Sequence, residues 1–232
     1  MSEVAPSIVD TIRAKHEELA ALTPAVRRDL ELDLPPAASL ARDWEPGSWH
    51  RLPMHPNELS AIESSLAAPL PDDLRSTVLE LGNGMIGPGY GIKPLEMKAI
   101  LGSTQRLRRR WSIPEPLFPD FTRNYDRLIR RCGDGALVIS ELRRGTVYIV
   151  VLNGDERGNI WYDDSANSGV VAPVVCDSDG HLVEIAQLDL AGGEAVMKHF
   201  TELALGGKRV GFGDWYCGWL DKVIAATRVA LQ

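Results

Sequence analysis

Apolar residues recur at helical spacing over much of the chain. In the segment 7–20, Ile8, Ile12 and Leu19 fall near one face, which is typical of a helix packed against a core. Asn57 can cap a helix, and Pro71 suits the first helical position because its missing N–H has no partner in that turn. Periodicity and such start and stop signals together predict helices over the segments 7–20, 23–32, 57–66, 70–81, 97–111, 121–131, 193–205 and 214–231.

Short runs of β-branched and aromatic residues, separated by turn signals, predict strands in the second half of the chain. The runs 136–140 and 146–152 predict a hairpin, and 160–162 predicts a third strand. The runs 170–175 and 182–185 flank a turn and predict a further hairpin. Strands that follow one another without intervening helices indicate antiparallel pairing. We therefore predict an α+β fold with a mostly antiparallel sheet of about four to six strands packed with helices.

The stretch 70–96 (LPDDLRSTVLELGNGMIGPGYGIKPLE) predicts a helix, a glycine-rich corner and a short strand at 90–95. Gly82, Gly84 and Gly87 match the pattern G-x-G-x-x-G. In nucleotide-binding chains a strand delivers these glycines and a helix follows, so that helical N–H groups face the phosphates. Here the helix comes first and a Pro-Gly turn follows. We therefore favour a structural corner over dinucleotide binding.

Two later segments follow this stretch, 146–164 (TVYIVVLNGDERGNIWYDD) and 212–220 (FGDWYCGWL). In that order the three segments resemble the SUKH superfamily, which includes fungal Smi/Knr-type cell-wall regulators and many bacterial immunity proteins. The resemblance implies a SUKH-like α+β domain, which we place at 53–232, preceded by a helical and proline-rich N-terminal arm at 1–52. The segment 180–211 departs from the resemblance because it is longer than expected there.

Composition narrows the classes of function. The chain has 232 residues and 44% apolar content, enough for one good-sized core. It lacks a long apolar run, so we expect neither a secretory signal nor a membrane span. Its three cysteines are widely spaced and fit neither zinc spacing nor a disulfide framework, which favours the cytoplasm. No histidine pair has metal-binding spacing, and no serine elbow or phosphate loop is present, so we expect no catalytic site, metal or cofactor.

Charge is uneven along the sequence. The net charge is −7, but the segment 98–144 alone carries 11 basic and 5 acidic residues. An acidic majority argues against nucleic-acid binding and is compatible with a basic protein partner. Within the basic segment, the predicted helix carries Arg106, Arg108, Arg109 and Arg110 on one face. A solvated helix face is the favoured interpretation, and a docking patch for an acidic partner is the alternative.

Two acidic pairs lie beside aromatic residues around the predicted third strand. An acidic rim around aromatic side chains is the composition of an interaction hot spot. Solvated turn acids, partner-facing acids, and catalytic or metal-binding acids remain open as alternatives. Because strand side chains alternate, one of the two strand aromatics, Trp161 or Tyr162, must face outward. The candidate partner-binding residues are Tyr90, Asp155, Glu156, Arg157, Trp161, Tyr162, Asp163 and Asp164.

The expected function is non-enzymatic protein binding. By resemblance, the chain would be a bacterial immunity protein that neutralises a cognate toxin by steric occlusion, without nucleic-acid or membrane partners. The alternative is a regulatory scaffold or ligand-binding domain of the fungal cell-wall-regulator type. An enzyme ranks third.

Overall fold

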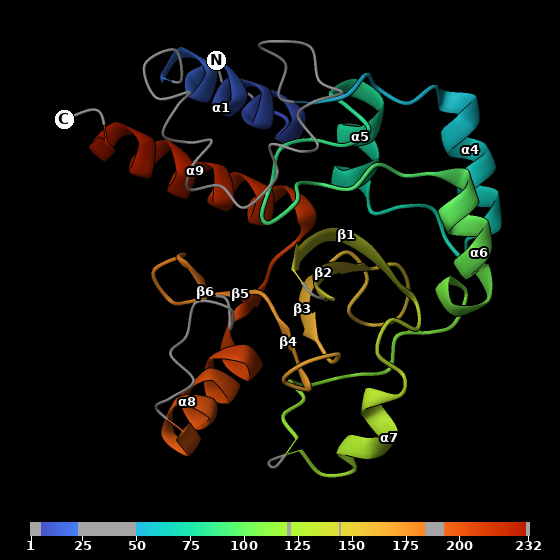
Figure 1. The fold of residues 1–232 in the computed structure, drawn as a ribbon, viewed down its shortest axis with the longest axis vertical. Helices are drawn as coiled ribbons and strands as arrows, with labels where there is room; N and C mark the ends of the chain where they lie inside the picture. Colours follow the sequence, from blue (N-terminus) through green and yellow to red (C-terminus); the bar gives the residue numbers. More distant parts are fainter. Residues whose placement is uncertain (1–5, 23–49, 120–121, 144, 184–192, 231–232) are drawn as a thin grey trace, which may run out of the picture.

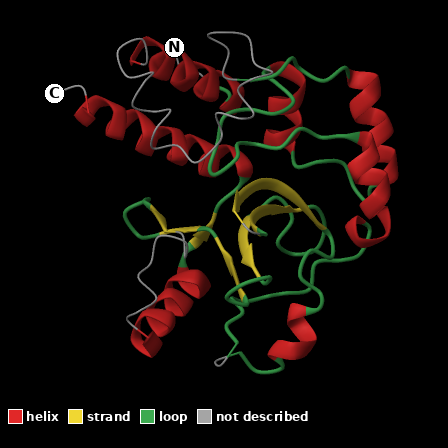
Figure 2. Cartoon of the chain, in the orientation of Figure 1, coloured by secondary structure: helices red, strands yellow, loops and turns green. Residues whose placement is uncertain are grey.

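The computed structural model describes residues 6–119, 122–143, 145–183 and 193–230, except for 23–49. These residues form seven helices and two antiparallel sheets, so the α+β prediction is confirmed (Figures 1 and 2). The larger sheet has four strands and the smaller has three. The sheets occupy the middle of the molecule, with helices on several sides (Figure 2).

The larger sheet is an antiparallel meander in the order β1-β2-β3-β4. Its strands are β1 (Ala136–Arg143), β2 (Thr146–Val151), β3 (Ile160–Asp164) and β4 (Val170–Pro173). The register pairs the start of β1 with the end of β2, and the start of β2 with the end of β3. The β2–β3 turn therefore lies at the same end of the sheet as the entry to β1. The β1–β2 and β3–β4 turns lie at the opposite end.

The smaller sheet has β5 (Val175–Cys176) between β6 (Leu182–Val183) and β7 (Lys208–Arg209). The sequence predicted one strand over 170–175, and this is wrong. The run is divided at Val174: its N–H still donates to the Ile160 carbonyl of β3 at 2.9 Å, but the next two residues pair with β6 and β7 of the smaller sheet. The β5–β6 pairing confirms the predicted second hairpin as far as Val183.

Three helices cover one side of the sheets: α1 (Ile8–Leu22), α5 (Asp72–Glu80) and α9 (Phe212–Ala230). Figure 1 shows α1 beside α9, and both α1 and α9 also contact α5. Apolar residues of α1 share the main core with Trp215 and Tyr216 of α9, both completely buried. The first helix of the predicted arm is therefore packed into the main core together with α5 and α9. The domain boundary at 52/53 stays a prediction, and the helix predicted at 23–32 lies outside the described residues.

The other helices are α4 (Pro56–Ser65), α6 (Met97–Leu107), α7 (Tyr125–Ile129) and α8 (Gly193–Gly206). The prediction carried α6 on to Trp111, whereas it ends at Leu107. The reason is packing: the Trp111 ring leaves the helix and meets Trp161 of β3 at a centroid distance of 5.1 Å in a second core. Within the described residues no helix has the length and apolar character needed to cross a membrane.

Two predicted helix starts are shifted by one or two residues. The N-cap of α4 is His55, whose Nδ1 accepts the Asn57 N–H at 3.2 Å, so Asn57 is inside the helix. Pro56 thus occupies the first helical position, where its missing N–H is not needed. Pro71 is the N-cap of α5 rather than its first helical residue. In both cases the helix itself was predicted, and only the position of the proline relative to its first turn differs.

The glycine-rich corner after α5 is held by Asn83. Its Oδ1 accepts the Leu95 N–H at 2.7 Å and its Nδ2 donates to the Leu95 carbonyl at 3.1 Å. The strand predicted at 90–95 is not regular. Only Ile92 pairs, as a bridge to Met85 on one side and to Ser140 of β1 on the other. The corner therefore covers the edge of β1, as expected of a structural element.

Candidate interaction surface

The first predicted acidic pair lies in the β2–β3 turn. Asp155 is exposed and its carboxylate accepts a hydrogen bond from the Arg110 guanidinium at 2.6 Å. Glu156 is mostly covered and pairs with Arg209 of β7 at 3.0 Å. Arg157 is exposed, and its guanidinium donates to the carbonyls of two residues in the loop before α5. Of the two acids, Asp155 is the one whose carboxylate remains accessible to a partner.

The second acidic pair ends β3 and is buried. Asp163 is 9% exposed and Asp164 is 7% exposed. Asp164 accepts hydrogen bonds from Thr146 Oγ1 at 2.6 Å and Asn167 Nδ2 at 2.7 Å, and from the backbone and hydroxyl of Ser168. Burial alone would raise the pKa of Asp164, but these hydrogen bonds outweigh it and the pKa lies below its usual value. The solvated-acid interpretation is therefore wrong for this pair, because neighbouring turns enclose it.

Trp161 and Tyr162 alternate to opposite faces of the sheet, but each packs on a core cluster, so the expectation that one of them faces outward is wrong. Trp161 is completely buried, while Tyr162 is partly buried and packs on two core clusters. Burial, aided by the nearby carboxylates of Asp164 and Asp163, raises the pKa of the Tyr162 hydroxyl to about 12. Tyr90 lies at the β1 edge, where its N–H donates to the Glu141 carbonyl at 2.8 Å. With β2 between β1 and β3, Tyr90 is not brought against the β3 aromatics.

The predicted site is thus distributed rather than gathered. Asp155, Glu156 and Arg157 lie at one end of the larger sheet, whereas Asp163 and Asp164 lie at the other, because the antiparallel register separates them. These residues do not form a single acidic patch. Whether any of them contacts a partner stays a prediction.

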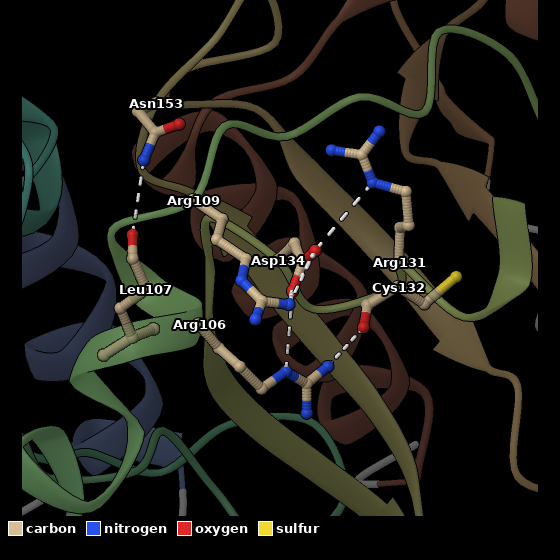
Figure 3. Close-up of polar contacts among 7 residues, drawn as sticks. All are labelled: Arg106, Leu107, Arg109, Arg131, Cys132, Asp134 and Asn153. Atoms are coloured by element: carbon tan, nitrogen blue, oxygen red, sulfur yellow. Dashed lines mark hydrogen bonds and ion pairs between the residues drawn. The ribbon is translucent and has the colours of Figure 1, made fainter.

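A cluster of arginines around Asp134 lies at the same end as Asp155, and the sequence did not predict it. Arg106, Arg109 and Arg131 all approach the Asp134 carboxylate, at 3.8, 3.3 and 3.9 Å (Figure 3). The Asp134 side chain is 5% exposed, whereas the three arginine side chains are 49–59% exposed. We call these four residues the Asp134 cluster. Arg106 and Arg109 are solvated, as the favoured interpretation expected, but both also converge on a buried acid, which it did not predict.

Two glycines allow this cluster to form. Gly133 and Gly135 flank Asp134 and both have positive φ, at 81° and 67°. A Cβ at Gly133 would collide with the Arg106 guanidinium, and one at Gly135 would collide with the Arg109 carbonyl. The Gly135 N–H also donates to the Arg106 carbonyl at 2.9 Å, which fixes the end of α6 to the turn. An acid between two glycines, following a run of arginines, was the available sequence signal.

Nucleophilic and titratable groups elsewhere are engaged in packing. Burial raises the pKa of the Cys132 thiol to about 12 and that of Cys217 to about 11. Burial, together with the charge of nearby His50, lowers the pKa of His16 to about 4. His16 Nε2 lies 2.8 Å from the Tyr216 hydroxyl. These thiols and this imidazole are therefore part of the core, with the thiols protonated near pH 7.

One group in the described part of the chain has ligand atoms close enough to hold a metal ion. The oxygens of Asp177 and Asp179 and a ring nitrogen of His181 lie within 4.8 Å of one another. Asp177 Oδ1 already accepts the N–H groups of Asp179 and His181 at 2.9 Å each. The spacing therefore follows from a tight, exposed turn between β5 and β6.

The three segments behind the SUKH resemblance contact one another. The Tyr216 hydroxyl donates to the Ile86 carbonyl at 2.7 Å, and the Trp215 ring lies 4.9 Å from that of Tyr148. The glycine-rich corner, the second strand and the last helix thus meet in one core. Comparison with protein-family models, with curated proteins and with solved structures found no match to this chain.

Proposed function

We propose that this chain is a non-enzymatic protein-binding domain, and specifically an immunity protein that neutralises a cognate toxin. The observation that carries the proposal is that the segments behind the SUKH resemblance pack together as one framework, through Tyr216 and Trp215 of α9. The resemblance implies a toxin encoded beside this chain and a shared cytoplasmic location.

The mechanism would be steric occlusion. A domain of this kind blocks an active site by covering it, so it needs a rigid surface with exposed polar and charged groups. The end of the larger sheet that holds Asp155 and the Asp134 cluster supports such a role. It is built on the β2–β3 turn, the end of α6 and the turn before β1, all tied by backbone hydrogen bonds.

The test is co-expression of this chain with each neighbouring open reading frame, scoring growth and pull-down together. A neighbour that is lethal alone, harmless with this chain, and co-purified in fixed stoichiometry would support the proposal. If no neighbour is toxic or bound, the immunity proposal fails. A chain that instead captures several unrelated partners would favour the regulatory scaffold.

Surface variants then map the interface. Asp155→Ala changes an exposed side chain at the end of the sheet, and Asp221→Ala is its control on α9. Both carboxylates are exposed and both form one ion pair, with Arg110 and Lys15 respectively. The proposed surface requires that the affinity for the captured partner change in Asp155→Ala and stay unchanged in the control. Unchanged affinity in both would exclude this turn from the interface.

A further inference from the structure

The Asp134 cluster carries more positive charge than its own carboxylate can neutralise. Three guanidinium groups share one carboxylate, which leaves a surplus of two positive charges among four residues. Arg108 lies next to the cluster in the chain and donates to the carbonyls of Ser64 and Ser65. Those carbonyls orient its side chain without cancelling its charge. The end of α6 therefore presents a local excess of positive charge, although the whole chain is acidic.

The hydrogen-bonding capacity of these arginines is also incompletely used. Arg106 Nε and Arg131 Nε lie 3.8 and 3.9 Å from Asp134, beyond hydrogen-bond distance, so they interact with it through charge alone. Arg109 donates a long hydrogen bond to Asp134 at 3.3 Å, and Arg106 Nη2 donates to the Cys132 carbonyl (Figure 3). A guanidinium has five N–H donors and pairs best with a carboxylate in a two-pronged geometry, which none of these contacts provides. Half-exposed donors thus remain available to an incoming anion.

Asp134 positions these arginines. It is buried between two glycines of positive φ, and its carboxylate is aimed at Arg106 and Arg109 from the end of α6 and at Arg131 from its own turn (Figure 3). Long arginine side chains lose rotamer freedom when a ligand fixes them, and a preplaced counter-charge reduces that cost. The cluster is thus arranged before any partner arrives.

We propose that this surface, formed by the Asp134 cluster and Arg108, binds an acidic segment of a partner protein. The inference rests on the proposed function and deepens it, because it specifies the charge of the partner's contacting surface. That surface should be acidic, whereas the net charge of the whole chain suggested a basic partner. Asp155 belongs to the same end of the sheet, but Arg110 already pairs with it. The arginines therefore make the net charge at this end of the larger sheet positive.

A protein segment fits this surface better than a nucleic acid. Single-stranded nucleic acids need exposed aromatic side chains on which bases stack. The neighbouring aromatic, Trp111, is 3% exposed and packs on Trp161. An extended phosphate backbone would also run beyond this patch onto a chain whose remaining charge is strongly negative. A short acidic segment of a protein can contact the patch alone.

The experiment measures binding of a fluorescent hexaglutamate peptide to the full chain by anisotropy, at low and at physiological salt. We expect binding that weakens with salt and falls about tenfold or more in Arg106→Gln/Arg109→Gln. The matched control is Arg13→Gln/Arg228→Gln, which removes the same charge from two exposed, ion-paired arginines on α1 and α9. Equal loss in both variants, or no binding to the parent chain, would overturn the proposal.

Asp134→Asn separates binding from mere structural support. It raises the surplus charge of the cluster by one, while the amide oxygen can still accept from Arg109 and keep the arginines placed, so peptide binding should tighten, provided that circular dichroism shows the fold intact. Weaker or unchanged binding in a folded Asp134→Asn variant would contradict the proposal. If the double glutamine variant does not fold, Arg131→Gln replaces it, because its contact with Asp134 is the longest of the three.

A single-stranded oligonucleotide with six phosphates serves as the competing probe. If the oligonucleotide binds more tightly than the peptide, and if the same variants abolish its binding, the partner class is a nucleic acid and the proposal fails. These results do not depend on finding a toxin. Peptide binding without a toxic neighbour would support this inference and reject the immunity proposal. A toxic neighbour that is neutralised, without peptide binding, would support the immunity proposal and reject this inference.

Discussion

Protonation of His16 should destabilise the fold in mildly acidic solution. The ring is 4% exposed, between α1 and α9. Because the Tyr216 hydroxyl donates its one proton to the Ile86 carbonyl, it must accept from His16 Nε2, which makes Nε2 the protonated nitrogen. His16 Nδ1 is then an unprotonated acceptor, buried without a hydrogen-bond partner in the described structure. A second proton there would add a buried charge with no counter-charge.

The size of the effect follows from the two pKa values. The pKa of His16 falls from 6.5 to about 4 on folding, first through burial and then through the charge of His50. The unfolded chain therefore binds this proton from about pH 6.5 downward, and the folded chain does not until about pH 4. Stability present above pH 6.5 is lost as the pH falls through this window. Linkage gives a decrease in the free energy of unfolding of about 2 kcal/mol between pH 7 and pH 5, and of about 3 kcal/mol once the pH is below both pKa values.

The assay is urea unfolding at a series of pH values for the parent chain, His16→Gln and His199→Gln. Glutamine can still donate to Tyr216 but does not titrate, so His16→Gln should lose about 2 kcal/mol less than the parent chain between pH 7 and pH 5. His199 is exposed on α8, and its substitution should leave the pH profile unchanged. Parallel profiles for the parent chain and His16→Gln would refute the argument.

Three further predictions concern stability and reactivity. Gly133→Ala should cost roughly 1–3 kcal/mol in urea unfolding because of its positive φ and the Arg106 collision, whereas Gly102→Ala, inside α6 with open space around it, should gain roughly 0.5–1 kcal/mol; equal effects would contradict this. The thiols of Cys132 and Cys217, with pKa values of about 12 and about 11, should react with iodoacetamide at pH 8 at least roughly 100-fold more slowly than free cysteine, as followed by peptide mass spectrometry; rapid labelling at either of these two positions, rather than at the partly buried Cys176, would refute their burial. Asp164→Ala should cost roughly 2–3 kcal/mol in urea at pH 7, because a carboxylate that accepts several hydrogen bonds is lost; since the folded pKa is lowered, the difference from the parent chain should shrink as the pH falls below about 4.

Local signals in the sequence were sufficient for most elements. The strands β1, β2 and β3 begin at the predicted residues or continue past the predicted ends, because β-branched runs between turn residues determine them locally. The end of α6 was missed because it depends on a distant residue: Trp111 leaves the helix to pack on Trp161. Helical spacing of apolar residues predicts that they are buried, but it does not predict which of two cores each residue packs into.

The charged residues were the least predictable part. Asp163 and Asp164 were expected in solvent because their neighbours in sequence are polar, but Thr146, from the preceding strand, helps to enclose Asp164. Asp134 was not predicted as the centre of a cluster because two of its three partners, Arg106 and Arg109, lie about 25 residues earlier in the chain. In both cases at least one contact comes from a distant part of the chain, and a count of local charge carries no information about such contacts.

Each end of the larger sheet has a buried carboxylate, but the groups around the two carboxylates differ in charge. This difference indicates where a partner should bind. Asp164 is surrounded by neutral donors from the chain itself, so its negative charge is fully hydrogen-bonded and offers little to another molecule. Asp134 is surrounded by cations that outnumber it, so a positive charge remains at the surface after its own contacts are counted. Satisfied groups stabilise a fold, whereas a surplus of fixed, half-exposed donors does little for stability in water. Binding should therefore be sought at the end that carries Arg106, Arg109 and the β2–β3 turn.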